Sequence, residues 1–240
     1  MSSLCSKRFA YLFICFVLIV IFGSSSTWLS IISAADSGDW PNCLSSEPGQ
    51  QPFDVAEHDC KNDPMNVSRD RSVLRTEQTL GLTPEEITFI GCDAAPFAAS
   101  MTIIDPPAHF QILYRNNRGS GSSYYLAPIL HEVGHVYQLK KAGSPQQLAE
   151  SLHRSVERAE LGADFLAGVA AKVLELNPDA AQQSIFLVGS YSSGELGSHG
   201  TAAHRASAFR MGYFYQPASD PVYTQYLDFQ NNRFAQIKHN

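Results

Sequence analysis

The segment HEVGH at residues 131–135 constrains the fold of this chain more than any other feature. His131 and His135 are four residues apart, so on a helix both imidazoles leave the same face about one turn apart. That separation suits two ligands of a single metal ion. Glu132 lies roughly 100° around such a helix, where it reaches a water beside the ion but does not join the ligands. The fold must therefore bring a third ligand from another segment.

The residues around this motif predict a helix. Apolar positions recur at helical spacing from Leu126 to Lys141, and Gly143 follows as a C-terminal signal. The competing interpretation is a surface helix that carries both histidines on its solvated side. Random order of this composition gives the HExxH spacing in roughly one such chain per hundred, which favours metal binding.

A second, longer helix is predicted directly after the first. Ser144, Pro145 and Gln147 match a capping box with proline at the first helical position, and Asn177 and Pro178 are expected to end the helix near Leu176. Small residues on this helix should let the two helices approach closely enough to share an ion: Gly162, Ala163, Ala167 and Gly168.

This second helix offers the third ligand. Glu160 and Asp164 lie on one face, so Glu160 can bind the ion while Asp164 accepts a hydrogen bond from a ligating imidazole. His153 and Glu157 lie on the same stripe, and spacing alone leaves both open as ligands. The alternative for the whole stripe is the solvated face of a long helix.

The patterns in the rest of the sequence predict a mixed α and β chain. Residues 36–72 lack periodicity and are expected to be irregular, whereas residues 72–82 and 202–215 favour helices. Three segments rich in β-branched and aromatic residues, 87–92, 100–104 and 109–116, predict short strands in one small antiparallel sheet. The class expected is therefore α+β.

The N-terminus is typical of an exported protein. Lys7 and Arg8 precede an apolar run from Phe9 to Phe22, so residues 1–35 are expected to be a signal peptide or a membrane anchor. Residues 36–240 are then one domain outside the cytoplasm, secreted, periplasmic or membrane-anchored. That part has 15 basic and 23 acidic residues, a formal charge of −8, because both basic residues before Asp36 are removed. Such a charge argues against a nucleic-acid partner.

Three cysteines lie beyond the apolar N-terminus. Cys43 and Cys60 flank a polar loop with proline and glycine, and an oxidising compartment favours a disulfide between them. Cys92 is then expected to be free and buried. No Cys-x-x-Cys spacing occurs, so a zinc site built from cysteines is disfavoured.

Three motifs in order resemble a family of bacterial neutral zinc metallopeptidases: HEVGHVYQ, ELGADFLAG and HGTAAHRASAFRMGY, within residues 120–215. More distantly, they resemble membrane-associated zincins with H-E-x-x-H and E-x-x-A-D motifs. The resemblance implies a zincin-like fold, Zn²⁺ as cofactor, Glu160 as the third ligand and Asp164 as a residue that supports the site. The chain departs from the pattern in a single histidine after the Val-Gly pair and in the additional His204.

The third motif maps onto His199, Gly200, Thr201 and Arg205. Our hypothesis is that His199 orients substrate or stabilises the oxyanion and that Arg205 pairs with a carboxylate near the site. The alternative is that the segment SHGT only caps the following helix.

These features together predict zinc-dependent hydrolysis of peptide bonds in proteins or peptides, with Glu132 as the general base. A substrate peptide is expected along the edge of the sheet. Two alternatives remain: a catalytically silent zinc protein that binds or assembles envelope components, and hydrolysis of a non-peptide amide. A membrane contact is expected only through the N-terminal segment.

Overall fold

The computed structural model describes six stretches of the chain, all within one compact unit, Trp40–Asn240. These are residues 60–93, 99–105, 109–115, 122–188, 200–217 and 219–237. The expected leader, Cys43 and His199 therefore lie outside the described residues. None of the described helices combines the length and the apolar character needed to cross a bilayer.

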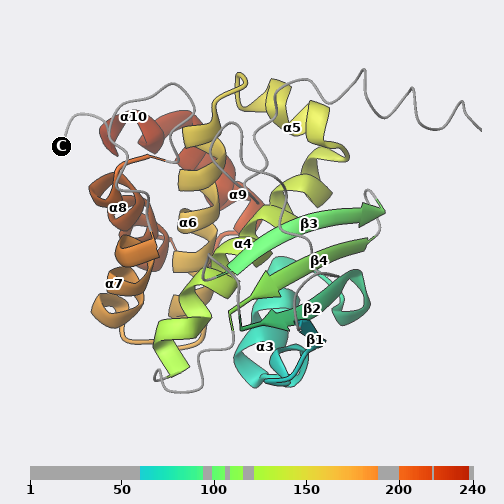
Figure 1. The fold of residues 1–240 in the computed structure, drawn as a ribbon. Coiled ribbons are helices and arrows are strands. Elements are labelled where there is room, and N and C mark those ends of the chain that lie inside the picture. The colour runs from blue at the N-terminus through green and yellow to red at the C-terminus, as the bar shows by residue number, and fades with distance from the viewer. Residues whose placement is uncertain are drawn as a thin grey trace, which may run out of the picture. The chain divides into compact units, whose positions relative to one another are not determined.

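One small sheet and a group of helices form this unit (Figure 1). The strands are β1 (Cys60–Asn62), β2 (Ile87–Cys92), β3 (Ala99–Asp105) and β4 (His109–Tyr114). The helices are α3 (Arg71–Leu80), α4 (Ser122–Ala142), α5 (Pro145–Ser151), α6 (Val156–Val173), α7 (Pro178–Val188), α8 (Ala202–Tyr213), α9 (Val222–Asp228) and α10 (Phe234–Ile237). Single turns occur at Val67–Arg69, Pro84–Glu86 and Phe229–Arg233, the last a π-helical turn.

The three predicted strands are present, but the prediction of an antiparallel sheet is wrong. The strand order is β1-β2-β4-β3, and β4 inserts between two strands that are consecutive in the sequence. It pairs antiparallel with β3 and parallel with β2, which makes the sheet mixed. Residue alternation identifies strands but carries no information about which strands are neighbours. The short strand β1 lies in the segment that was expected to be irregular, and it was not predicted from the sequence.

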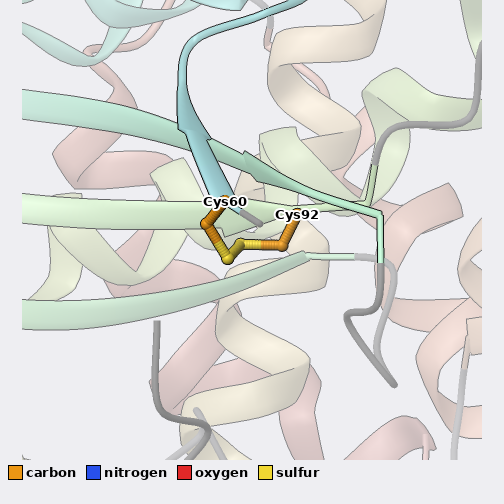
Figure 2. Close-up of a disulfide and its surroundings, with 2 residues drawn as sticks. All are labelled: Cys60 and Cys92. Carbon is orange, nitrogen blue, oxygen red and sulfur yellow. A yellow bond between two sulfur atoms is a disulfide. The ribbon is translucent and has the colours of Figure 1, made fainter. Parts of the chain in front are cut away.

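The predicted cysteine pairing is also wrong, because Cys60 is bonded to Cys92 (Figure 2). β1 pairs antiparallel with β2, and its register places these two cysteines directly opposite each other, with 4.3 Å between their Cα atoms. That separation is close enough for a disulfide bond. The bridge therefore ties the edge strand β1 to the sheet.

Helix α4, which carries the HEVGH motif, is central and not a surface helix. Every residue from Leu126 to Leu139 is buried. The helix packs against α6 and α7 and also against strands β3 and β4, so it lies between the sheet and these two helices (Figure 1). The interpretation of His131 and His135 as part of a solvated face is therefore wrong.

The predicted long second helix is interrupted. α5 ends at Ser151, and α6 begins at Val156 with the Ser155 hydroxyl accepting a hydrogen bond from the Arg158 amide. His153 and Arg154 between them both have φ of 56°, a left-handed conformation that ends a helix. Neither glycine nor proline marks the break, so the helical pattern continues through it in the sequence. α7 begins at Pro178, where the sequence predicted only an end.

Helices α6 and α8 lie in direct backbone contact. A Cβ atom added at Gly168 would lie 2.0 Å from the Phe209 carbonyl oxygen, and one added at Gly212 would lie 2.0 Å from that of Phe165. Only glycine permits so close an approach at these two positions. The contact fixes α8, and with it Arg205, beside α6.

Candidate metal centre

Two helices position the candidate ligands. His131, Glu132 and His135 come from α4, and Glu160 comes from α6. The helices approach closely at Gly134, where an added Cβ would lie 3.0 Å from the Ala163 carbonyl oxygen. A glycine one residue before the second histidine therefore brings the ligands of both helices together.

His131, His135 and Glu160 form a buried cluster whose candidate ligand atoms all lie within 4.8 Å of one another. The two Nε2 atoms are 3.1 Å apart. Each of them is 3.3 Å from a different carboxylate oxygen of Glu160. Ligand atoms that are 2.0–2.1 Å from a tetrahedral zinc ion lie roughly 3.3–3.4 Å from one another. The three groups therefore fit one small cation.

The outer nitrogens of the two histidines show which atoms face the cluster. His131 Nδ1 donates to Asp164 Oδ1 at 2.7 Å, and His135 Nδ1 donates to Gln138 Oε1 at 2.9 Å. Each imidazole in its neutral form then presents the lone pair of Nε2. Two lone pairs and a carboxylate at these distances repel one another, and a cation between them removes the repulsion.

Asp164 and Arg205 form the support of His131. The Arg205 guanidinium donates to both carboxylate oxygens of Asp164, from Nε at 2.8 Å and from Nη2 at 2.9 Å. Burial opposes the charge of Asp164, but Arg205 and then His131 hold the pKa of this carboxyl below its usual value. Arg205 also lies near the ligand carboxylate, with Nη2 4.0 Å from Glu160 Oε2.

The surroundings of the ligands favour positive charge. Burial alone would lower the pKa of His131, but the carboxylate of Asp164 outweighs it, and the pKa is raised to about 10. Glu160 has a pKa well below its usual value because His135 and His131 overcome the effect of burial. With Glu132 ionised and both histidines neutral, as metal ligands must be, the three carboxylates and the guanidinium of Arg205 leave two negative charges, which a divalent cation balances.

Glu132 is buried beside this cluster. Its side chain is close enough for the charges of His131, His135, Glu160 and Arg205 to act on its pKa. Burial is the largest influence and raises that pKa. Its Oε2 atom has no hydrogen-bond partner among the described residues. A buried carboxylate oxygen without a donor is costly, and it is suited to accept a proton at that position.

Two residues that spacing left open do not join the cluster. Glu157 Oε1 lies 3.1 Å from His204 Nδ1, on the side of α6 that faces α8. His153 lies in the connection between α5 and α6. The Thr201 hydroxyl caps α8 by accepting from the His204 amide, as the capping alternative for SHGT expects of that segment.

Gln138 contacts the cluster but was missed from the sequence. It lies three residues after His135 and seven after His131, so all three side chains leave one face of α4. That i, i+4, i+7 spacing was the signal that could have found it.

Searches of family models, of curated proteins and of solved structures find no match to this chain. The function is therefore argued from the site itself.

Proposed function

We propose that this protein is a zinc metallopeptidase of α+β, zincin-like type that acts outside the cytoplasm. The observation that carries the proposal is the meeting of His131, His135 and Glu160 at 3.1–3.3 Å, with Glu132 buried beside them. Two imidazoles and a carboxylate are ligands that zinc commonly takes in hydrolytic enzymes. Three protein ligands leave a fourth position open, which is typical of a catalytic site and not of a structural one.

Zinc at such a site supplies Lewis acidity toward a carbonyl oxygen and lowers the pKa of a water molecule. The chain's own residues supply the rest of the chemistry. Glu132 accepts a proton from the attacking water at Oε2 and returns it to the leaving amine. Asp164 orients His131 through Nδ1, and Arg205 holds Asp164 in place with two hydrogen bonds. A role of His199 in orienting substrate or stabilising the oxyanion remains our hypothesis.

The substrate class proposed is a protein or peptide. β3 pairs with β4 on one side and has no second partner among the described strands, and α4 packs against it. A peptide that adds to this edge by strand pairing would run beside the helix that carries Glu132.

The Cys60–Cys92 disulfide supports an oxidising compartment, in agreement with the apolar N-terminus.

The burial of the ligands favours one alternative, a catalytically silent zinc protein with a binding or assembly role. His131, His135 and Glu160 are only 5%, 2% and 2% exposed. A metal that only stabilises a fold needs no access for substrate. Against this alternative, a structural site needs no general base, and it usually has four protein ligands.

The test compares the wild type with Glu132→Gln, using a mixture of unstructured peptides analysed by mass spectrometry. We expect Glu132→Gln to bind zinc as the wild type does and to lose at least about 100-fold in hydrolysis, because the amide cannot accept the proton. Glu150→Gln, at an exposed position on α5, is the matched control and should cleave normally.

Cleavage that is equally fast in Glu132→Gln would refute the proposed mechanism. Zinc binding without any cleavage by the wild type would instead favour the silent protein. Cleavage of N-acylated amines but of no peptide would assign the site to non-peptide amides.

A further inference from the structure

Gln138 connects both helices of the candidate metal centre. The residue is buried, with 1% of its surface exposed. Its Oε1 atom accepts from His135 Nδ1 at 2.9 Å, and its Nε2 atom donates to the Ala159 carbonyl at 2.9 Å. Ala159 immediately precedes Glu160 on α6. The amide thus joins one ligand to the backbone beside another.

The Ala159 carbonyl determines how the amide of Gln138 is oriented. A backbone carbonyl only accepts hydrogen bonds, so the amide NH₂ must face it and the oxygen must face His135. That oxygen only accepts, which requires a proton on His135 Nδ1. A neutral imidazole carries only one proton, so Nε2 has none. Its lone pair faces the candidate metal position beside His131 and Glu160.

A second amide, from the C-terminal part of the chain, lies against the same part of α6. Gln230, in the π-helical turn between α9 and α10, donates from Nε2 to the Arg158 carbonyl at 3.1 Å, and Arg158 Nη1 donates to the Gln230 carbonyl at 3.0 Å. The amide nitrogens of Gln138 and Gln230 each lie 2.5 Å from where a Cβ at Gly162 would be. Only a glycine leaves room for both amides against α6. Any side chain at position 162 would therefore displace the Gln138 amide.

We infer that Gln138 is a positioning residue that fixes His135 in its metal-binding tautomer and is itself oriented by the Ala159 carbonyl. The inference rests on the proposed metal site. The two histidines are then supported differently, His131 by the carboxylate of Asp164 and His135 by a neutral amide. A second carboxylate would add a negative charge to an already acidic cluster, and the amide avoids this.

The test measures zinc affinity of the full-length protein by competition with a chromophoric chelator, for the wild type, Gln138→Met and Gln138→Glu. Methionine has a similar length but accepts no comparable hydrogen bond, so we expect its affinity to fall about 10- to 100-fold. Glutamate keeps an acceptor for His135 Nδ1 but loses the donor to the Ala159 carbonyl, so its affinity should fall less than that of Gln138→Met. The visible spectrum of the Co²⁺-loaded protein should change in Gln138→Met and much less in Gln138→Glu.

Thermal unfolding of the metal-free proteins separates this role from packing. Equal affinities of Gln138→Met and the wild type would overturn the inference, and so would an equal loss of affinity in Gln138→Met and Gln138→Glu. Either result leaves the proposed function intact as long as the wild type binds zinc tightly. A wild type that binds no zinc would overturn both.

Discussion

Asp164 has two partners in the site, and its replacement by asparagine tests both. Asp164→Asn removes the charge that neutralises the buried Arg205 and places an amide where a bidentate carboxylate was. Breaking a buried ion pair from one side costs about 3–5 kcal/mol of unfolding free energy. Loss of the support of His131 should also weaken metal binding about 10- to 100-fold. Urea unfolding and zinc competition measure the two effects.

Asp179→Asn is the matched control, because Asp179 pairs with Arg210 at 3.0 Å on the surface, with 82% of its side chain exposed. An exposed pair contributes about 0–1 kcal/mol. If Asp164→Asn behaved like this control in both measurements, the support assigned to Asp164 would be wrong.

Glu77 on α3 gives a prediction about pH that is independent of the metal. The side chain is buried, and neither carboxylate oxygen has a partner among the described residues. Burial, with smaller contributions from Glu85 and Glu86, raises its pKa to about 7. The folded state therefore holds the proton more tightly than the unfolded state. The contribution of Glu77 to the unfolding free energy is therefore largest below pH 4.5 and decreases as the pH rises toward 7.

Glu77→Gln mimics the protonated acid and should remove this loss. The stability difference is the unfolding free energy of Glu77→Gln minus that of the wild type. We expect this difference to increase by up to roughly 3 kcal/mol between pH 4.5 and 8. Denaturant titrations of the metal-free proteins at several pH values measure it. The exposed Glu150→Gln should show no such change, and a difference that is constant with pH would contradict the assignment.

The sequence predicts individual site residues where a spacing fixes their geometry. The interval of four residues places His131 and His135 on one helix face, and the same interval places Glu160 with Asp164. It does not separate Glu160 from Glu157, because the choice depends on which face of α6 meets α4. Gln138 was missed because a glutamine on a buried helix has no chemistry of its own until its partners are known.

The contact between α6 and α8 is the element-level feature on which the position of Arg205 depends. In Gly168→Ala, the added methyl group would meet the rigid backbone at Phe209, so the helices must separate. We expect a loss of about 1–3 kcal/mol in unfolding free energy. Because Asp164 and Arg205 lie on these two helices, zinc affinity should fall as well.

Gly81→Ala provides the comparison at the end of α3. Its φ of 66° makes alanine unfavourable by about 1–2 kcal/mol, but no atom lies within 4 Å of the new methyl group. This variant should lose stability without losing zinc affinity. Unchanged zinc affinity in Gly168→Ala would show that the site tolerates movement of α8.

Elements with a strong local pattern are predictable from this sequence, whereas their connections and neighbours are not. Helices α3, α4 and α8 and strands β2, β3 and β4 all occur near their predicted positions. The break between α5 and α6 depends on left-handed residues without glycine, which the local sequence does not indicate. The insertion of β4 beside β2 is a tertiary arrangement, and the cysteine pairing follows from the strand register.

At the scale of the whole molecule, the central proposal is that α4 and α6 together bind a metal ion. Three carboxylates and two histidines gather in the interior of a chain with a formal charge of −6. Without a cation, the buried carboxylates are balanced, among the described residues, only by Arg205 and by a proton on His131. The metal should therefore be part of the folded protein.

The most direct test is the metal content of the purified full-length chain by mass spectrometry, with wild type, Glu160→Ala and Glu157→Ala compared after metal-replete expression. Glu157 lies one turn before Glu160 on the same helix and contacts His204 instead of the histidine pair. We predict about one zinc per chain in the wild type and in Glu157→Ala, and little or none in Glu160→Ala. Absence of metal from the wild type, or its loss in Glu157→Ala but not in Glu160→Ala, would contradict the proposed metal site.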